Sequence, residues 1–183
     1  MAPIVALIGF MGSGKTTVGR RVARLLDWDF LDLDDEVTAQ AGCSIPELFA
    51  REGEADFRRR ECAALREVME RDPARGTVVA LGGGTVTSPE AAQCVRRKAL
   101  VVYLEADAAT TWERVRRSDR PLARDADAFA ALLEERRRVY EHTAHAVVPV
   151  SGRPPAEIAR QVADIARAWE EGPSTDSVSE TDS

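Results

Sequence analysis

Short apolar runs alternate along this chain with longer amphipathic segments. The runs lie at residues 3–8, 29–33, 77–81, 100–104 and 146–150. Four of them are rich in valine, isoleucine and leucine, and the run at 29–33 also contains two aspartates. Short runs of this kind are typical of β-strands. The sequence therefore predicts five strands, with helical patterns between them.

The segments between these runs carry apolar residues at helical spacing. In the first segment, one face is formed by Val18, Val22, Leu25 and Leu26. In the last, over residues 155–171, a stripe is formed by Ile158, Val162, Ile165 and Trp169. A capping box, Ser44 to Glu47, opens a short helix, and further helices are predicted over residues 54–71, from Ser88 onward and over 128–140. Strands that alternate with helices indicate an α/β fold, with a five-stranded, doubly wound parallel sheet flanked by helices.

Composition and charge narrow the class of protein. With 183 residues, 44% of them hydrophobic, the chain suits one domain, which we place at residues 1–171, followed by a disordered acidic tail at 172–183. A net charge of −6 argues against a nucleic-acid partner. The three cysteines are isolated, which indicates neither a zinc site nor disulfides, and no signal peptide or long apolar run occurs. We therefore expect a cytoplasmic monomer without a membrane partner.

Residues 9–16 fit the phosphate-binding pattern G-x-x-x-x-G-K-[ST], between the first apolar run and the first predicted helix. Glycines there let backbone N–H groups point at phosphates beside the positive end of the helix. Lys15 should reach the β- and γ-phosphates, and Thr16 should ligate Mg²⁺. Only Lys15 and Lys98 are lysines among 25 basic residues, which indicates that this loop requires a compact ammonium group. The sequence therefore predicts binding of a nucleoside triphosphate.

Three further features follow predicted strands. Asp32 and Asp34 could divide labour, one holding hydrated Mg²⁺ and the other taking a proton from a hydroxyl group, or they could form a polar strand end before a helix. The glycines at 82–84 would allow close approach of the backbone to a ligand, or form a flexible turn. Arg120, in a polar stretch at 118–127, could close over the γ-phosphate as a short mobile lid, or be one more solvated arginine.

Taken together, these residues resemble the shikimate kinase family over about residues 1–170. The resemblance rests on GFMGSGKTT at 9–17, DLD at 32–34, FRR at 57–59 with Glu61, LGGGTV at 81–86, RPL at 120–122, Arg136 with Tyr140, and RPP at 153–155. The phosphate-binding loop is shared with many nucleotide-binding proteins, whereas the ordered set is specific. It implies a P-loop kinase fold and ATP- and Mg²⁺-dependent phosphorylation of the 3-hydroxyl group of shikimate, on the route to chorismate and aromatic amino acids.

The same resemblance implies roles for individual residues. ATP phosphates would be bound by Gly12, Ser13, Gly14, Lys15, Thr16 and Thr17, and Mg²⁺ by Thr16 with Asp32 acting through water. The residues of catalysis would be Asp34 as the base, Lys15 and Arg120. Shikimate would be bound by Asp34, Arg58, Glu61, Gly82, Gly83, Gly84 and Arg136. In this set Arg58 and Arg136 take the carboxylate and Glu61 orients Arg58. Arg120 would also bridge the transferred phosphate, and adenine would be flanked by Arg117 and Arg153.

The chain departs from the family pattern at two places. Ala123 follows the RPL motif where a second leucine is usual, and only two residues separate Arg117 from Arg120, so the lid is short. Thr85 stands where alanine is common after the glycines.

Other functions remain open at this point. The nearest alternatives are a gluconate or nucleoside monophosphate kinase of the same fold, followed by a non-kinase P-loop ATPase. A nucleotide acceptor would need base-reading side chains, whereas this chain has no asparagine and only 5% aromatic residues. The missing asparagine also excludes the Asn-Lys-x-Asp guanine reader of a P-loop GTPase.

Overall fold

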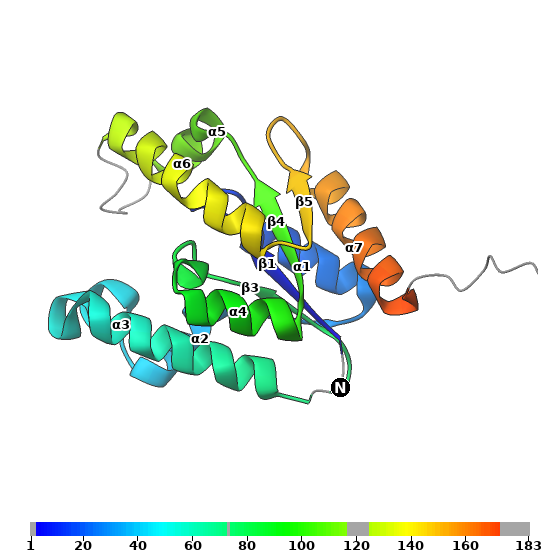
Figure 1. The fold of residues 1–183 in the computed structure, drawn as a ribbon, viewed down its shortest axis with the longest axis horizontal. Coiled ribbons are helices and arrows are strands. Elements are labelled where there is room, and N and C mark those ends of the chain that lie inside the picture. The colour runs from blue at the N-terminus through cyan, green and yellow to red at the C-terminus, as the bar shows by residue number, and fades with distance from the viewer. Residues whose placement is uncertain (1–2, 73, 117–124, 173–183) are drawn as a thin grey trace, which may run out of the picture.

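A parallel sheet forms the centre of the fold (Figure 1). The computed structural model of the chain describes residues 3–72, 74–116 and 125–172. Its strands are β1 (Ile4–Ile8), β2 (Asp29–Asp32), β3 (Thr77–Ala80), β4 (Leu100–Glu105) and β5 (Ala146–Pro149). They lie in the order β2-β3-β1-β4-β5, and every neighbouring pair is parallel. The predicted five-stranded parallel sheet is confirmed.

Helices cover both faces of this sheet. They are α1 (Lys15–Leu26), α2 (Leu33–Ala41), α3 (Ile45–Glu70), α4 (Pro89–Lys98), α5 (Ala108–Val115), α6 (Ala126–Thr143) and α7 (Pro155–Glu171), with a 3₁₀ turn η1 (Thr85–Thr87). The helices α1 and α7 pack on one face, and α3, α4 and α6 lie over the other (Figure 1). Strand β1 is buried along its whole length, because its alternate side chains enter two separate cores.

The predicted helices are present, some with different bounds. The capping box of Ser44 and Glu47 is confirmed, and the two helices predicted after it together form α3. They are separated at Gly53, whose φ of 80° interrupts the helical backbone. The helix predicted over 128–140 extends to Ala126–Thr143, and the sequence pattern predicts neither the short α5 nor η1. Of the helices described, none has both the length and the apolar character needed to cross a membrane.

Two side chains of the predicted apolar faces are exposed. Leu25 is 45% exposed, because the buried face of α1 includes Val22 and Ala23 and turns away from Leu25. Trp169 is 54% exposed near the end of α7, whereas Ile158 earlier in the stripe is buried. The apolar stripes in the sequence therefore extend beyond the surfaces that the sheet covers.

Asp34 lies in a helix, whereas the sequence pattern places it at the end of a strand. Strand β2 ends at Asp32, and α2 begins at Leu33, so Asp34 belongs to the first turn of α2. Asp32 caps that helix, since its Oδ1 accepts a hydrogen bond from the backbone N–H of Asp34 at 3.2 Å. The two carboxylates thus sit on either side of a fixed strand-to-helix junction.

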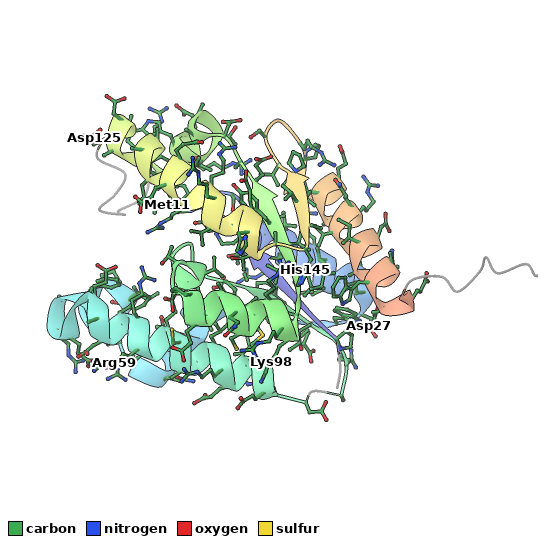
Figure 2. All side chains as sticks on the ribbon, viewed as in Figure 1. Met11, Asp27, Arg59, Lys98, Asp125 and His145 are labelled. Carbon is green, nitrogen blue, oxygen red and sulfur yellow. The ribbon has the colours of Figure 1, made fainter. Side chains whose placement is uncertain are left out.

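His145 connects the end of α6 to β4. Its Nδ1 accepts the backbone N–H of Val101 at 3.0 Å, and its own backbone N–H donates to the carbonyl of Val101 at 2.8 Å. The ring packs against Trp169 with 4.9 Å between centroids, on the β5 and α7 side of the sheet (Figure 2). Burial lowers the pKa of His145, and the charge of Arg96 lowers it further. The neutral ring is the form that this environment favours.

We expect the free energy of unfolding to fall as the pH drops below about 6.5, the ordinary histidine pKa. In that range the unfolded chain takes up a proton on His145 while the folded chain resists it, so stability that is present above the unfolded pKa is lost. His145→Asn keeps an acceptor for the N–H of Val101 but does not titrate, so its stability should depend less on pH. Urea unfolding at about pH 7.5 and about pH 5.5 measures the difference. An identical pH dependence in both proteins would contradict this prediction.

Candidate active site

A cavity of about 290 Å³ opens at the carboxyl ends of β1, β2 and β3. Its lining consists of Met11, Gly12, Gly14, Lys15, Thr16, Thr17, Asp32, Asp34, Ala80, Leu81, Gly82, Gly83 and Arg114. Ligands of open parallel sheets bind at this edge. A second cavity of about 230 Å³ lies near the other end of the strands, around Trp28, Leu100 and Trp169, and contains none of the predicted site residues.

The loop between β1 and α1 curls beneath the cavity on two glycines. Gly12 has a φ of 82°, and Gly14, which caps α1, has a φ of 94°, a backbone conformation that L side chains rarely adopt. Lys15 Nζ donates to the carbonyls of Gly9 at 2.7 Å and Phe10 at 3.0 Å. The loop is therefore already shaped as an anion-binding turn at a helix N-terminus.

The side chains of Thr16 and Asp32 place two oxygen atoms that could ligate a metal ion beside that loop. The Oγ1 of Thr16 donates to Asp32 Oδ2 at 2.7 Å. Hydroxyl and carboxylate oxygens are hard ligands, and Mg²⁺ is commonly held by one or two such groups together with substrate phosphates. The pair therefore fits a Mg²⁺ ion bound between the protein and a nucleotide.

Two carboxylates and a hydroxyl group surround Gly82. A Cβ at this glycine would lie 2.8 Å from Glu61 Oε1, 2.9 Å from Asp34 Oδ1 and 3.0 Å from Thr85 Oγ1. None of the glycines at 82–84 is among those with a left-handed backbone, so space and not conformation explains this glycine. The groups that approach this glycine are the protein's own side chains, and its approach to a ligand stays a prediction.

Arg58 lies against the backbone of Gly84. A Cβ at Gly84 would be 2.6 Å from Arg58 Nη2 and 2.8 Å from Nη1. The Nη1 group donates to Glu61 Oε2 at 2.7 Å, and Glu61 is only 2% exposed. This is the contact that the expected orienting role of Glu61 requires. Arg59, the next residue, lies on the outer side of α3 and its side chain is 75% exposed (Figure 2).

Helix α6 reaches the same glycine loop from the other side. Arg136 Nη1 donates to the carbonyl of Gly83 at 3.3 Å, and the hydroxyl group of Tyr140 donates to the same carbonyl at 2.5 Å. The guanidinium of Arg136 also lies 5.8 Å from the ring centre of Phe10. Burial raises the pKa of Tyr140 to about 12, so its hydroxyl group is a donor and not a base at neutral pH. Tyr140 thus holds the glycine loop by a short hydrogen bond, and Arg136 lies next to the same loop.

Some predicted residues lie away from the cavity. Arg153 occupies the turn before α7, where it donates to the carbonyl of Pro149 at 2.8 Å and to Glu157 Oε1 at 2.8 Å, and it is absent from the cavity lining. Ser13 is buried in the phosphate-binding loop, and its Oγ has no hydrogen-bond partner within the described part of the chain. Arg117, Arg120 and most of the predicted lid stretch lie outside the described residues, whereas its last residues, 125–127, form the cap and the start of α6. The adenine contacts of Arg117 and Arg153 therefore stay predictions.

Arg114 lines the cavity, although the sequence pattern does not single it out. It lies on α5, and its Nη1 donates to the carbonyl of Gly12 at 3.0 Å. The same nitrogen is 3.8 Å from the position of a Cβ at Gly14. This chain is rich in arginine, and the residues around Arg114 in the sequence resemble a solvated helix face. Only the packing of α5 on the phosphate-binding loop distinguishes Arg114 from the solvated arginines.

Comparisons with known proteins agree on one family. A family model described as shikimate kinase matches residues 11–167. A shikimate kinase from Bordetella pertussis is 39% identical over 91% of this chain and 79% of its own length. The structure of shikimate kinase from Acinetobacter baumannii in complex with shikimate superposes with a TM-score of 0.84 at 33% identity, covering 90% of this chain and 93% of that one. A gluconokinase from Sinorhizobium meliloti 1021 covers 93% of this chain and 94% of that one, and at 18% identity and a TM-score of 0.56 it shares the fold alone.

We expect Gly82→Ala to lower the free energy of unfolding by about 1–3 kcal/mol, because the added Cβ forces apart the buried, hydrogen-bonded side chains of Glu61 and Thr85. Gly84→Ala should cost less, because the crowded group is the end of the Arg58 side chain, which is 31% exposed and can move. Gly83→Ala is the matched control, since its Cβ would meet its nearest neighbour, the backbone nitrogen of Met11, at 3.4 Å. That is an ordinary contact, and the change in stability should stay below about 1 kcal/mol. Urea unfolding measures all three variants. Equal losses in the three would show that crowding does not explain the glycines.

Proposed function

Because the chain belongs to the shikimate kinase family, we propose that it transfers the γ-phosphoryl group of ATP to the 3-hydroxyl group of shikimate, giving 3-phosphoshikimate and ADP. One observation supports this substrate most directly: Arg58 and Arg136 flank a glycine loop that borders the phosphate-binding loop. Guanidinium groups bind carboxylates through paired N–H groups, and shikimate carries one carboxylate beside its hydroxyl groups. The product belongs to the route to chorismate and aromatic amino acids.

In this proposal, the loop after β1 holds the nucleotide. Backbone N–H groups at the start of α1 bind the phosphates, and Lys15 exchanges the carbonyls of Gly9 and Phe10 for phosphate oxygens. Thr16 and, through water, Asp32 would hold Mg²⁺, which would offset phosphate charge. Arg114, which donates to the carbonyl of Gly12, would lie beside the nucleotide. The family resemblance implies that Arg120 would bridge the transferred phosphate.

The loops after β2 and β3 hold the acceptor. The two arginines fix its carboxylate, which turns the hydroxyl groups toward Asp34 in the first turn of α2. Asp34 binds the hydroxyl groups and accepts the proton of the one that attacks the γ-phosphorus. Holding both substrates at one sheet edge supplies the orientation that makes the transfer effectively intramolecular.

Expectations about localisation, oligomeric state, domain bounds and partners belong to the same proposal. The enzyme would act as a cytoplasmic monomer, with one kinase domain over residues 1–171 and a tail at 172–183. Its partners would be small molecules and neither nucleic acids nor membranes. The net charge of −6 supports the absence of a nucleic-acid partner.

Gluconate kinase is the alternative that the site geometry alone does not exclude, because gluconate also combines a carboxylate with hydroxyl groups. Family membership favours shikimate, since the gluconokinase resembles this chain in fold alone. Nucleoside monophosphates fit less well, because Arg58 and Arg136 flank the glycine loop beside the cavity. Among the described residues that line the cavity, none has an amide side chain that could read a base.

An ADP-release assay over a panel of acceptors tests the proposed function. With ATP and Mg²⁺, shikimate should stimulate ADP release, while gluconate and nucleoside monophosphates should not. Chelation of Mg²⁺ should abolish the reaction. Equal stimulation by gluconate or a nucleotide, with none by shikimate, would refute the proposal.

Asp34→Asn should lower kcat by about 100-fold or more, the usual scale for loss of a positioned base. Asparagine has nearly the same shape, so nucleotide affinity should survive. Asp35→Asn, at the exposed next position of α2, is the matched control and should keep its activity. Steady-state kinetics and nucleotide titration measure both. A near-normal kcat for Asp34→Asn would assign Asp34 a structural role and make Asp32 the next candidate.

Arg58→Ala and Arg136→Ala should each raise the Kd of shikimate about 10- to 150-fold, because each removes a charge-assisted fork. ATP affinity should stay close to its normal value. Arg59→Ala, beside Arg58 but exposed, should leave both affinities unchanged. Calorimetric titration gives all these constants. Normal shikimate affinity in both site variants would mean that other arginines hold the carboxylate.

A further inference from the structure

Thr85 directly follows the glycine loop, and its side chain is enclosed. It is 1% exposed, and its Oγ1 donates a hydrogen bond to Glu61 Oε1 at 2.6 Å. Arg58 Nη1 donates to the other carboxylate oxygen, Oε2, at 2.7 Å. Each oxygen of Glu61 therefore has its own donor, and the two donors come from different elements of the fold.

The second donor matters because Glu61 is a buried carboxylate. Such a group is stabilised only where hydrogen bonds and opposite charge replace water. The terminal torsion of a glutamate is broad, so a single contact with Arg58 leaves the carboxylate plane free to turn. A donor on each oxygen fixes that plane.

The ion pair with Glu61 also fixes the position of the Arg58 guanidinium. The other carboxylate near Arg58, Glu54, is 69% exposed and 3.5 Å away, and ion pairs at such exposed positions contribute little. Gly84 then provides the flat surface against which the guanidinium rests.

We propose that Thr85 is a positioning residue for acceptor binding. Its hydroxyl group fixes the Glu61 carboxylate, and Glu61 in turn holds Arg58 against Gly84, available to the carboxylate of the acceptor. This inference rests on the proposed function, in which that acceptor is shikimate.

Two substitutions remove the hydroxyl group in different ways. Thr85→Val keeps the shape of the side chain, and Thr85→Ala avoids any packing strain should the valine variant fold poorly. Thr85→Ser restores the donor. Thr143→Val is the matched control, because Thr143 is equally buried but its hydroxyl group donates to the carbonyl of Val139 in its own helix, at 2.7 Å.

Calorimetric titration of the full chain with shikimate, and separately with ADP and Mg²⁺, measures the effect. We expect Thr85→Val and Thr85→Ala to raise the Kd of shikimate about 5- to 20-fold and to leave the Kd of ADP within about twofold. Thr85→Ser and Thr143→Val should bind both ligands like the wild type. In a Glu61→Gln background, Thr85→Val should add less than about a twofold further loss, because the group through which it acts has already been altered.

Each contrary outcome has a definite meaning. Unchanged shikimate affinity in Thr85→Val and Thr85→Ala overturns the inference, as does an equal loss of ADP affinity or an undiminished loss in the Glu61→Gln background. A wild-type protein that binds no shikimate and releases no ADP with it overturns the proposed function, and the inference with it. If the wild type binds shikimate normally and the Thr85 variants bind it equally well, the inference alone is overturned.

Discussion

The buried carboxylate of Glu61 is the constraint on which the acceptor side of this site depends. A carboxylate that is 2% exposed needs charge and hydrogen bonds in place of water, and Arg58 and Thr85 supply them from α3 and η1. The glycine loop makes this possible, because a Cβ at Gly82 or Gly84 would occupy the space of the carboxylate or of the guanidinium. The shape of the loop is thus dictated by what must pack beneath it.

The parallel sheet brings this acceptor side next to the phosphate-binding loop. Strand β1 lies between β3 and β4, so the loops after β1 and β3 emerge side by side, and β2 adds its junction with α2 at the same edge. Helix α6 contacts both the phosphate-binding loop and the glycine loop. Arg136 lies over Phe10 of the first, and the hydroxyl group of Tyr140 donates to the carbonyl of Gly83 in the second. The two loops are therefore packed against the same helix.

Local signals made much of this predictable from the sequence. The strands and the phosphate-binding loop follow from short runs and fixed spacings, and family resemblance identified Arg58 with Glu61, three residues apart on one helix. Contacts between distant segments gave no such signal: Thr85 meets Glu61 across 24 residues, and Arg114 meets Gly12 across 102. The same limit explains Leu25, whose exposure depends on how α1 is covered and not on its hydrophobicity.

A crystal structure of the full chain with shikimate and ADP tests the central claim most directly, because it locates the acceptor carboxylate. The arrangement described above requires that carboxylate to contact the guanidinium groups of both Arg58 and Arg136, beside Gly83, with a ring hydroxyl group within hydrogen-bonding distance of Asp34. Shikimate bound with its carboxylate on other arginines, or with its hydroxyl groups away from Asp34, would contradict it.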